Sequence, residues 1–364
     1  MIQRLRNLNV RAFNAPGVGQ RMLVPPDWIV LGVNNVCNLH CKMCDVGTGF
    51  DGSNFYQNLL GARPINMPRD LIFDVIDQTA RSFPKTGIGY AFTEPLIYPH
   101  LIESLARADD NGLRTLMTTN GLWLPKLADD LCRAGLDQLS ISLDGPAEVH
   151  NAIRGNKKSF EKAREGIEKI VRHPGRRPRV SVFCTVTEWN QDRLAEMVEL
   201  FVDLPLQTLG FMHLNFTTDA MADAHNRAWG HRYPATASNM EGIDLDAIDL
   251  EALQAEVARV RRVDAPFPVT FSPELNTAAE LHRFYRDPMV RVGRRCNDAF
   301  SAMMVKSDGS VIPAHGRCYQ VVAGNLYSDS LADIWNCTAM RQFRAALIEE
   351  GGMLPACTRC CSAF

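Results

Sequence analysis

Between residues 28 and 212, short apolar runs alternate with amphipathic segments, and this rhythm constrains the fold more than any other feature of the chain. The apolar runs are typical of buried strands, and the segments between them place apolar residues at helical spacing. Repeated strand–helix units predict parallel strands joined by right-handed crossovers. The expected strands cover 28–36, 88–92, 114–117, 138–143, 179–186 and 208–212, and the expected helices cover 68–83, 99–110, 125–134, 160–172 and 191–202.

Six such units are fewer than the eight that close a full barrel. We therefore expect an α/β fold with a partial (β/α)6 TIM-like barrel. In sheets of this kind, functional residues gather at the carboxyl ends of the strands.

After the sixth strand the pattern changes twice. Residues 216–290 are loop-rich, with one expected helix near 246–262. A hairpin turn at Asp308-Gly309 and two helices, near 331–336 and 338–349, then indicate a small C-terminal α+β cluster-binding domain. The predicted organisation is an N-terminal extension (1–27), the barrel (28–215), a helical and loop connecting segment (216–290) and the cluster-binding domain (291–364).

Composition excludes several classes of protein. The formal net charge is −2, which gives no reason to expect a nucleic-acid partner. We see no apolar run long enough to span a membrane and no secretory signal, so we expect a cytoplasmic protein. The eleven cysteines are an odd number and gather near the two ends of the chain, which favours metal binding over disulfides.

Three cysteines, Cys37, Cys41 and Cys44, follow the first expected strand directly. Three thiolates on one loop can hold three irons of a [4Fe-4S] cluster and leave the fourth iron open to a small molecule. The alternative is a zinc site, which normally has four closed ligands. His40 is the nearby candidate for a fourth zinc ligand, although its spacing between two cysteines is awkward.

The Cys-x3-Cys-x2-Cys spacing resembles the signature of the radical S-adenosylmethionine (radical SAM) superfamily. The resemblance covers roughly residues 28–215 and implies that the cluster reductively cleaves S-adenosylmethionine (SAM). The resulting 5′-deoxyadenosyl radical then abstracts a hydrogen atom from a substrate. It also implies an external electron donor such as flavodoxin or ferredoxin.

The same resemblance implies a set of SAM-binding residues. Met43 takes the place of an aromatic residue beside the adenine, and Thr93-Glu94 resembles part of the motif that binds the methionine amino group. Strand alternation puts Ser140, Ser142 and Asp144 on one face, where they resemble a cofactor-binding motif. Asn120 ends the third strand, and Arg154 resembles an arginine that pairs with the cofactor carboxylate. The alternatives are an ordinary strand-end turn at Thr93-Glu94, a purely structural role for the polar residues of the fourth strand, and a surface position for Arg154.

A second group of cysteines lies near the C-terminus: Cys296, Cys318, Cys357 and Cys360, with Cys361 as a spare. The pattern around them resembles the SPASM and twitch auxiliary-cluster domains of the same superfamily. Because the chain stops soon after these cysteines, we expect the shorter twitch type, with one auxiliary [4Fe-4S] cluster. Ligation by four cysteines predicts electron transfer, ligation by three leaves an iron open to substrate, and zinc is the alternative.

Cys184 is a candidate catalytic residue in the fifth strand. If it faces the barrel interior, it can donate a hydrogen atom to a substrate radical, as an epimerase requires. Packing is the alternative, because buried cysteines are common in strands.

We expect a radical SAM enzyme that oxidises or epimerises a small polar substrate, such as a sugar or amino-sugar. The segment before the first strand is too short for a leader-peptide recognition domain, which makes peptide modification the second alternative. His213, Asn215 and His225 are candidates for contact with substrate or members of a solvated loop. A non-catalytic iron–sulfur electron carrier or a zinc-binding module is the alternative of another class.

Overall fold

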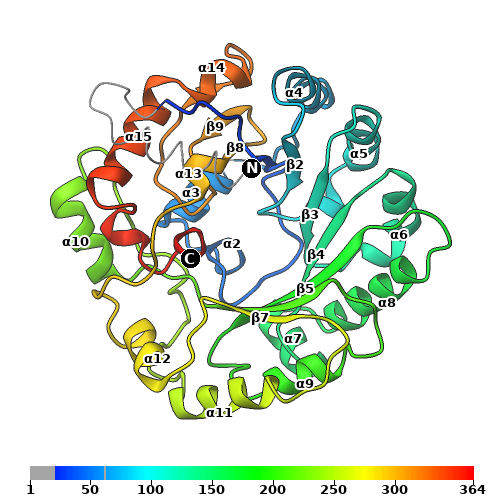
Figure 1. Cartoon of the computed structure of the whole chain (residues 1–364), viewed down its shortest axis with the longest axis vertical. Coiled ribbons are helices and arrows are strands. Elements are labelled where there is room, and N and C mark those ends of the chain that lie inside the picture. Colours follow the sequence, from blue (N-terminus) through cyan, green and yellow to red (C-terminus); the bar gives the residue numbers. More distant parts are fainter. Residues whose placement is uncertain (1–20, 61–62) are drawn as a thin grey trace.

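The computed structural model describes residues 21–60 and 63–364, so most of the expected N-terminal extension lies outside the described residues (Figure 1). Its strands join in one ten-stranded sheet of order β10-β9-β8-β1-β2-β3-β4-β5-β6-β7. Strands β1 to β8 pair with one another in parallel, whereas β9 pairs antiparallel with both β8 and β10. The strands are β1 Trp28–Leu31, β2 Gly87–Tyr90, β3 Thr115–Thr119, β4 Gln138–Ser142, β5 Arg179–Val186, β6 Thr208–His213, β7 Val269–Ser272, β8 Ala302–Val305, β9 Ser310–Ile312 and β10 Gly324–Asn325.

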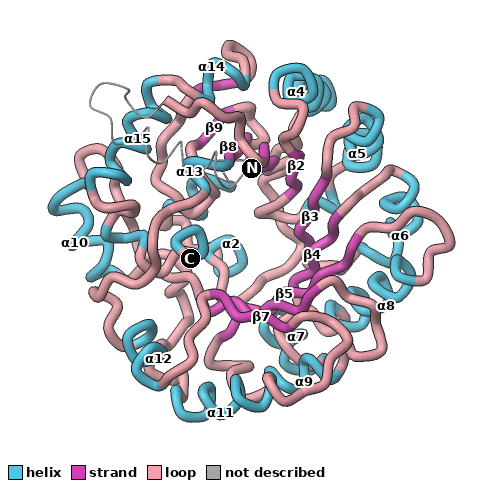
Figure 2. Tube along the Cα trace, viewed as in Figure 1, coloured by secondary structure: helices cyan, strands magenta, loops and turns pink. Residues whose placement is uncertain are grey.

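The helices form an outer ring around the curved sheet, as Figures 1 and 2 show. Helix α2 and the C-terminus lie towards the middle of that ring in Figure 1. The helices are α2 Asp45–Thr48, α3 Asn54–Leu59, α4 Arg69–Ser82, α5 Leu101–Asp110, α6 Leu124–Arg133, α7 Ala147–Arg154, α8 Ser159–Val171, α9 Leu194–Glu199, α10 Asp219–Trp229, α11 Leu250–Val260, α12 Ala278–Tyr285, α13 Asp298–Ser301, α14 Leu331–Trp335 and α15 Thr338–Glu349, with single 3-10 turns at Pro95–Ile97, Pro355–Cys357 and Cys361–Ala363.

Alternation along the strands sorts side chains between the helices and the barrel interior. Leu139, Ile141 and Leu143 are fully buried, whereas Ser140 and Ser142 between them are half-buried. Ile141 lies on the helix side, because a Cβ at Gly121 would meet both Ile141 (3.2 Å) and Ala163 of α8 (2.7 Å). The half-buried serines therefore face the barrel interior.

The α/β fold with a partial TIM-like barrel is confirmed, and the structure extends the parallel sheet at both edges. Strand β7 pairs with β6, and β8 pairs with β1 in parallel. Strand β7 escaped detection because it has four residues, of which only Phe271 is buried. The predicted hairpin around Asp308-Gly309 is formed by β8 and β9, so the C-terminal region continues the sheet of the barrel. No helix in the described part of the chain combines the length and apolar character needed to cross a bilayer.

Candidate metal centres and active site

The loop between β1 and α2 carries Cys37, Cys41 and Cys44 at the carboxyl end of the first strand. Cys41 is 7% exposed, and its thiol interacts electrostatically with those of Cys37 and Cys44. The end of α7 clamps the loop, because the N–H groups of His40 and Lys42 donate to the carbonyls of Arg154 (3.3 Å) and Ile153 (3.0 Å). The structure thus holds the three predicted ligands together.

Burial makes these thiols poor acids while no cation is present. It raises the pKa of Cys37 to about 11 and that of Cys44 to about 12. Only thiolates bind iron, so cluster assembly here must release protons, and the charge of the metal must compensate the desolvation. Three thiols on one loop, one of them buried and two partly buried, fit a cluster with one iron free of protein ligands.

Gly47 on α2 permits the close approach of that helix to the cysteine loop. A Cβ at this position would lie 2.4 Å from both the backbone N and the backbone O of Cys41. We expect Gly47→Ala to displace Cys41, to cost about 1–3 kcal/mol of folding free energy, and to lose most of the iron of this centre. Iron and sulfide analysis after anaerobic reconstitution measures the loss.

Gly52→Ala is the matched control, because a Cβ there would meet only the Phe50 side chain, at 3.4 Å. It should retain the iron content of the wild type. Equal iron in the Gly47 and Gly52 variants would contradict the packing argument.

A buried ion pair stands beside the cysteine loop. Arg154 donates from Nε to Oδ2 of Asp144 (2.5 Å) and from Nη1 to the Sγ of Cys41 (3.6 Å). The second oxygen of Asp144 accepts from the N–H of Thr185 (3.2 Å), and His150 Nδ1 accepts from the N–H of Asp144 (3.0 Å). Arg154 is therefore a buried neighbour of the cluster loop and not a surface residue. Its pairing with a cofactor carboxylate stays a prediction.

Glu94 is almost fully buried at the turn after β2. Its carboxylate accepts from the N–H of Leu96 (2.9 Å), the hydroxyl of Thr119 (2.6 Å) and the N–H of Asn120 (2.8 Å). In this structure the carboxylate organises the ends of β2 and β3. Its contact with the amino group of SAM stays a prediction.

Neighbouring polar residues complete this turn. The hydroxyl of Thr93 donates to the carbonyl of Asn34 (2.8 Å), and the side chain of Asn120 donates to Asn38 (2.8 Å). Phe92 has a φ of 86°, a conformation that glycine adopts freely and phenylalanine rarely does. At Phe92 the turn thus has a backbone conformation that glycine favours, although a phenylalanine occupies the position.

The predicted residues of β4 and β5 separate onto two faces of the sheet. Ser142 pairs in register with Phe183, so both point into the barrel, and Cys184 points to the opposite, helix-covered face. Cys184 is fully buried there, and Asn190 donates to its sulfur (3.6 Å). The condition for Cys184 to act as a hydrogen-atom donor is not met, because alternation turns it away from the interior. Met43, which lies in the cysteine loop between Cys41 and Cys44, is buried, and its contact with the adenine stays a prediction.

The four C-terminal cysteines meet although 64 residues of sequence separate the first from the last. Cys296, Cys318, Cys357 and Cys360 line one cavity together with His315. Burial raises the pKa of Cys357 to about 12 and places those of Cys296 and Cys318 well above the usual range. A closed set of four thiols fits a fully ligated cluster.

Residues absent from the sequence-based prediction line this cavity or hold the segments that carry its cysteines. The hydroxyl of Tyr319 lies 3.1 Å from the Sγ of Cys357, and Asn58 donates to the carbonyl of Cys318 (2.7 Å). Arg359, fully buried, donates to the carbonyls of Phe284 (2.7 Å) and Asp287 (2.9 Å) and so anchors the turn between Cys357 and Cys360 to the end of α12. Such long-range contacts have no local signal in the sequence.

The three candidate substrate contacts at and after the end of β6 lie in three different surroundings. His213 faces outward in register with Val186 and is buried against Tyr285, whose hydroxyl is 2.8 Å from Nδ1. His225 on α10 stacks on Tyr319 beside the second cysteine group. The carbonyl of Asn215 accepts from Arg317 (2.6 Å).

Burial of His213 predicts a pH dependence of stability. Desolvation lowers its pKa to about 3, from 6.5. Below pH 6.5 this histidine is protonated in the unfolded chain but stays neutral in the folded chain. The free energy of unfolding therefore falls by about 1.4 kcal/mol per pH unit as the pH decreases from about 6.5 to about 3. We expect the wild type to lose about 2.5 kcal/mol more than His213→Phe between pH 6.5 and 4.5, measured by chemical denaturation. Parallel losses in both proteins would contradict the prediction.

Comparison with known proteins agrees with this geometry. The family model for the radical SAM superfamily matches residues 32–201, and a model for an iron–sulfur cluster-binding domain, SPASM, matches residues 296–361. These ranges contain the two cysteine groups described above. The chain belongs to the radical SAM superfamily and carries a C-terminal SPASM domain.

Two curated relatives differ in how much of the chain they cover. Molybdenum cofactor biosynthesis protein 1 of Mus musculus is 33% identical over 198 residues, 52% of this chain and 28% of that protein. The chain thus spans little more than a quarter of that relative's length. The tungsten-containing aldehyde ferredoxin oxidoreductase cofactor-modifying protein of Pyrococcus furiosus is 23% identical over 356 residues, 92% of this chain and 86% of that protein.

Among solved structures, SuiB of Streptococcus suis in complex with SAM superposes with a TM-score of 0.61 at 16% identity, covering 98% of this chain and 76% of that chain. At this identity the likeness shows the fold.

Proposed function

We propose that this protein is a radical SAM enzyme that removes a hydrogen atom, and then an electron and a proton, from a small polar substrate. The carrying observation is that the three-cysteine loop lies at the carboxyl end of β1, within contact of the buried Asp144–Arg154 pair. When bound, an iron–sulfur cluster at the first cysteine group would supply the electron that cleaves SAM to the 5′-deoxyadenosyl radical, and a cluster at the second group would accept the second electron from the substrate.

The residues of the chain have separate parts in this scheme. Cys37, Cys41 and Cys44 hold the first cluster, while Asp144 orients Arg154 beside it. Thr93, Glu94, Asn120 and the interior-facing Ser140 and Ser142 offer polar contacts to SAM. Cys296, Cys318, Cys357 and Cys360 hold the auxiliary cluster. Flavodoxin or ferredoxin in the cytoplasm would deliver the first electron.

Oxidation is favoured over epimerisation by the position of Cys184. An epimerase must return a hydrogen atom to the substrate from a donor inside the barrel. Cys184 points to the helix-covered face, and four thiols at the second cavity fit an electron acceptor. The identity of the substrate, a sugar or amino-sugar among the options, remains a proposal.

A second candidate is modification of a cofactor or a peptide. Its support is that the Pyrococcus furiosus relative, which matches over 92% of this chain, is named a cofactor-modifying protein.

Deuterium tracing separates these possibilities. The anaerobically reconstituted protein should hold about eight irons and should convert SAM to 5′-deoxyadenosine when supplied with a reductant. Candidate substrates incubated in heavy water are then examined by mass spectrometry. Loss of two hydrogens supports oxidation, and a deuterium gained at carbon supports epimerisation. Reconstituted protein that never forms 5′-deoxyadenosine would contradict the proposal.

A further inference from the structure

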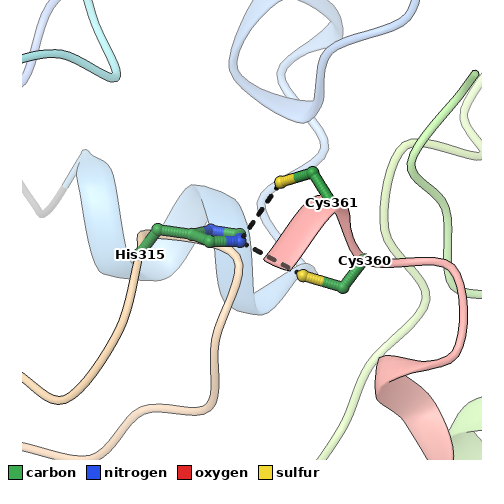
Figure 3. Close-up of side chains that lie close together, drawn as sticks. All are labelled: His315, Cys360 and Cys361. Carbon is green, nitrogen blue, oxygen red and sulfur yellow. Dashed lines mark hydrogen bonds between the residues drawn. The ribbon is translucent and has the colours of Figure 1, made fainter. Parts of the chain in front are cut away.

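His315 lies against two adjacent cysteines at the end of the chain (Figure 3). Its Nε2 atom is 3.2 Å from the Sγ of Cys360 and 3.7 Å from the Sγ of Cys361. One histidine and two cysteines at such distances match the ligand set of a mononuclear metal site. The same distances also fit a histidine that donates a hydrogen bond to sulfur, and the second ring nitrogen decides between the two.

The backbone of Arg317 sets the tautomer of His315. Its N–H donates to Nδ1 of His315 at 3.1 Å. A neutral imidazole has one N–H, so when Nδ1 accepts, the proton is on Nε2 and points at Cys360. A metal on Nε2 would move that proton to Nδ1, where it would oppose the Arg317 N–H. The loop therefore selects a donor and disfavours a metal ligand.

Packing holds the imidazole in this orientation. Asn58 of α3 donates to the carbonyl of Gly316 (2.9 Å), and a Cβ at Gly316 would meet Leu59 at 2.7 Å, so the loop lies tightly on α3. The ring of Phe92 stacks on that of His315, with centroids 6.4 Å apart and planes inclined by 28°. Phe92 belongs to the turn after β2, so this stack connects the barrel with the C-terminal region that carries His315.

We propose that His315 donates an N–H···S hydrogen bond to the Cys360 thiolate of the auxiliary cluster and thereby raises its reduction potential. The inference rests on the proposed function, in which Cys360 is a ligand of that cluster. Reduction adds negative charge to the cluster and its sulfur ligands, so a donor stabilises the reduced form more than the oxidised form. His315 is a positioning residue that acts on the cluster through Cys360.

The test measures the auxiliary cluster alone. Cys37, Cys41 and Cys44 are replaced by alanine in the full chain, and the cluster is titrated by EPR-monitored potentiometry. His315→Phe removes the donor but keeps a ring to stack on Phe92. We expect it to retain about four irons and to show a fall of about tenfold in the equilibrium constant of reduction, which equals ~59 mV. His315→Gln, which keeps an amide donor, should lie closer to the unsubstituted background.

Each other outcome contradicts the inference in a different way. An unchanged potential in His315→Phe would overturn it, and loss of iron in that variant would make His315 a ligand. If His315→Phe does not fold, ENDOR spectra of the background protein still decide, because the donated proton must exchange with deuterium and couple to the cluster. Absence of that signal, or a strong nitrogen coupling, overturns the inference. A background protein without iron would overturn the proposed auxiliary cluster and this inference with it.

Discussion

Cys41→Ala should reduce the iron content from about eight to about four per chain and end the formation of 5′-deoxyadenosine. Cys41 is the central ligand of its loop, and its sulfur accepts a hydrogen bond from Arg154. Without this thiolate, two sulfurs cannot retain a cube whose fourth corner has no protein ligand. Iron analysis and chromatography of the products measure both effects.

Cys132→Ala is the matched control for that experiment. Cys132 is also a buried free cysteine, but it lies on α6, and its electrostatic partners are surface charges. This variant should keep both the iron and the activity. A Cys41→Ala protein that still forms 5′-deoxyadenosine at the wild-type rate would refute the assignment of the first centre.

Asp144→Asn should destabilise the folded protein by about 3 kcal/mol, because it leaves a buried guanidinium without its counter-charge. Asp144 is fully buried, and the side chain of Arg154 is 11% exposed, so water cannot replace the lost carboxylate. The free Arg154 also lies against Cys41, so we expect lower occupancy of the first cluster. Denaturation of the reconstituted protein and iron analysis measure the two losses.

Asp130→Asn tests whether burial causes the effect. The Arg133–Asp130 pair has the same chemistry, with a contact of 2.5 Å, but its side chains are 65% and 44% exposed. Exposed pairs contribute about 0–1 kcal/mol, so this variant should unfold like the wild type. Equal stability of the Asp144 and Asp130 variants would contradict the role given to the buried pair.

Local patterns were sufficient for the elements of the barrel. The 3.6-residue spacing of Leu71, Ile72, Val75 and Ile76 predicted α4, because that spacing places apolar side chains on one helix face. Strand β7 was missed, since its four residues bury a single phenylalanine and carry almost no periodic signal. The parallel pairing of β8 with β1 joins residues more than 270 positions apart and has no local trace.

The features of the site also fall into those that local sequence patterns predicted and those that only the folded structure determines. Cysteine spacing predicted both metal centres, because clustered thiols are rare outside metal sites in chains of this kind. The direction of Cys184 was left open by alternation, which defines two faces without saying which one lies inside. Register with Ser142 and Phe183 resolves it.

By itself, the sequence determined the barrel class, the three-cysteine loop and the set of candidate sulfur ligands, because periodicity and spacing are local properties of the chain. Only the tertiary structure decided which partners Arg154 has, which way Cys184 points and which nitrogen of His315 carries the proton. The first two depend on contacts between different helices and strands, whereas the third depends on a backbone hydrogen bond from Arg317, two residues along the chain. All three require the folded geometry, which periodicity and spacing do not encode.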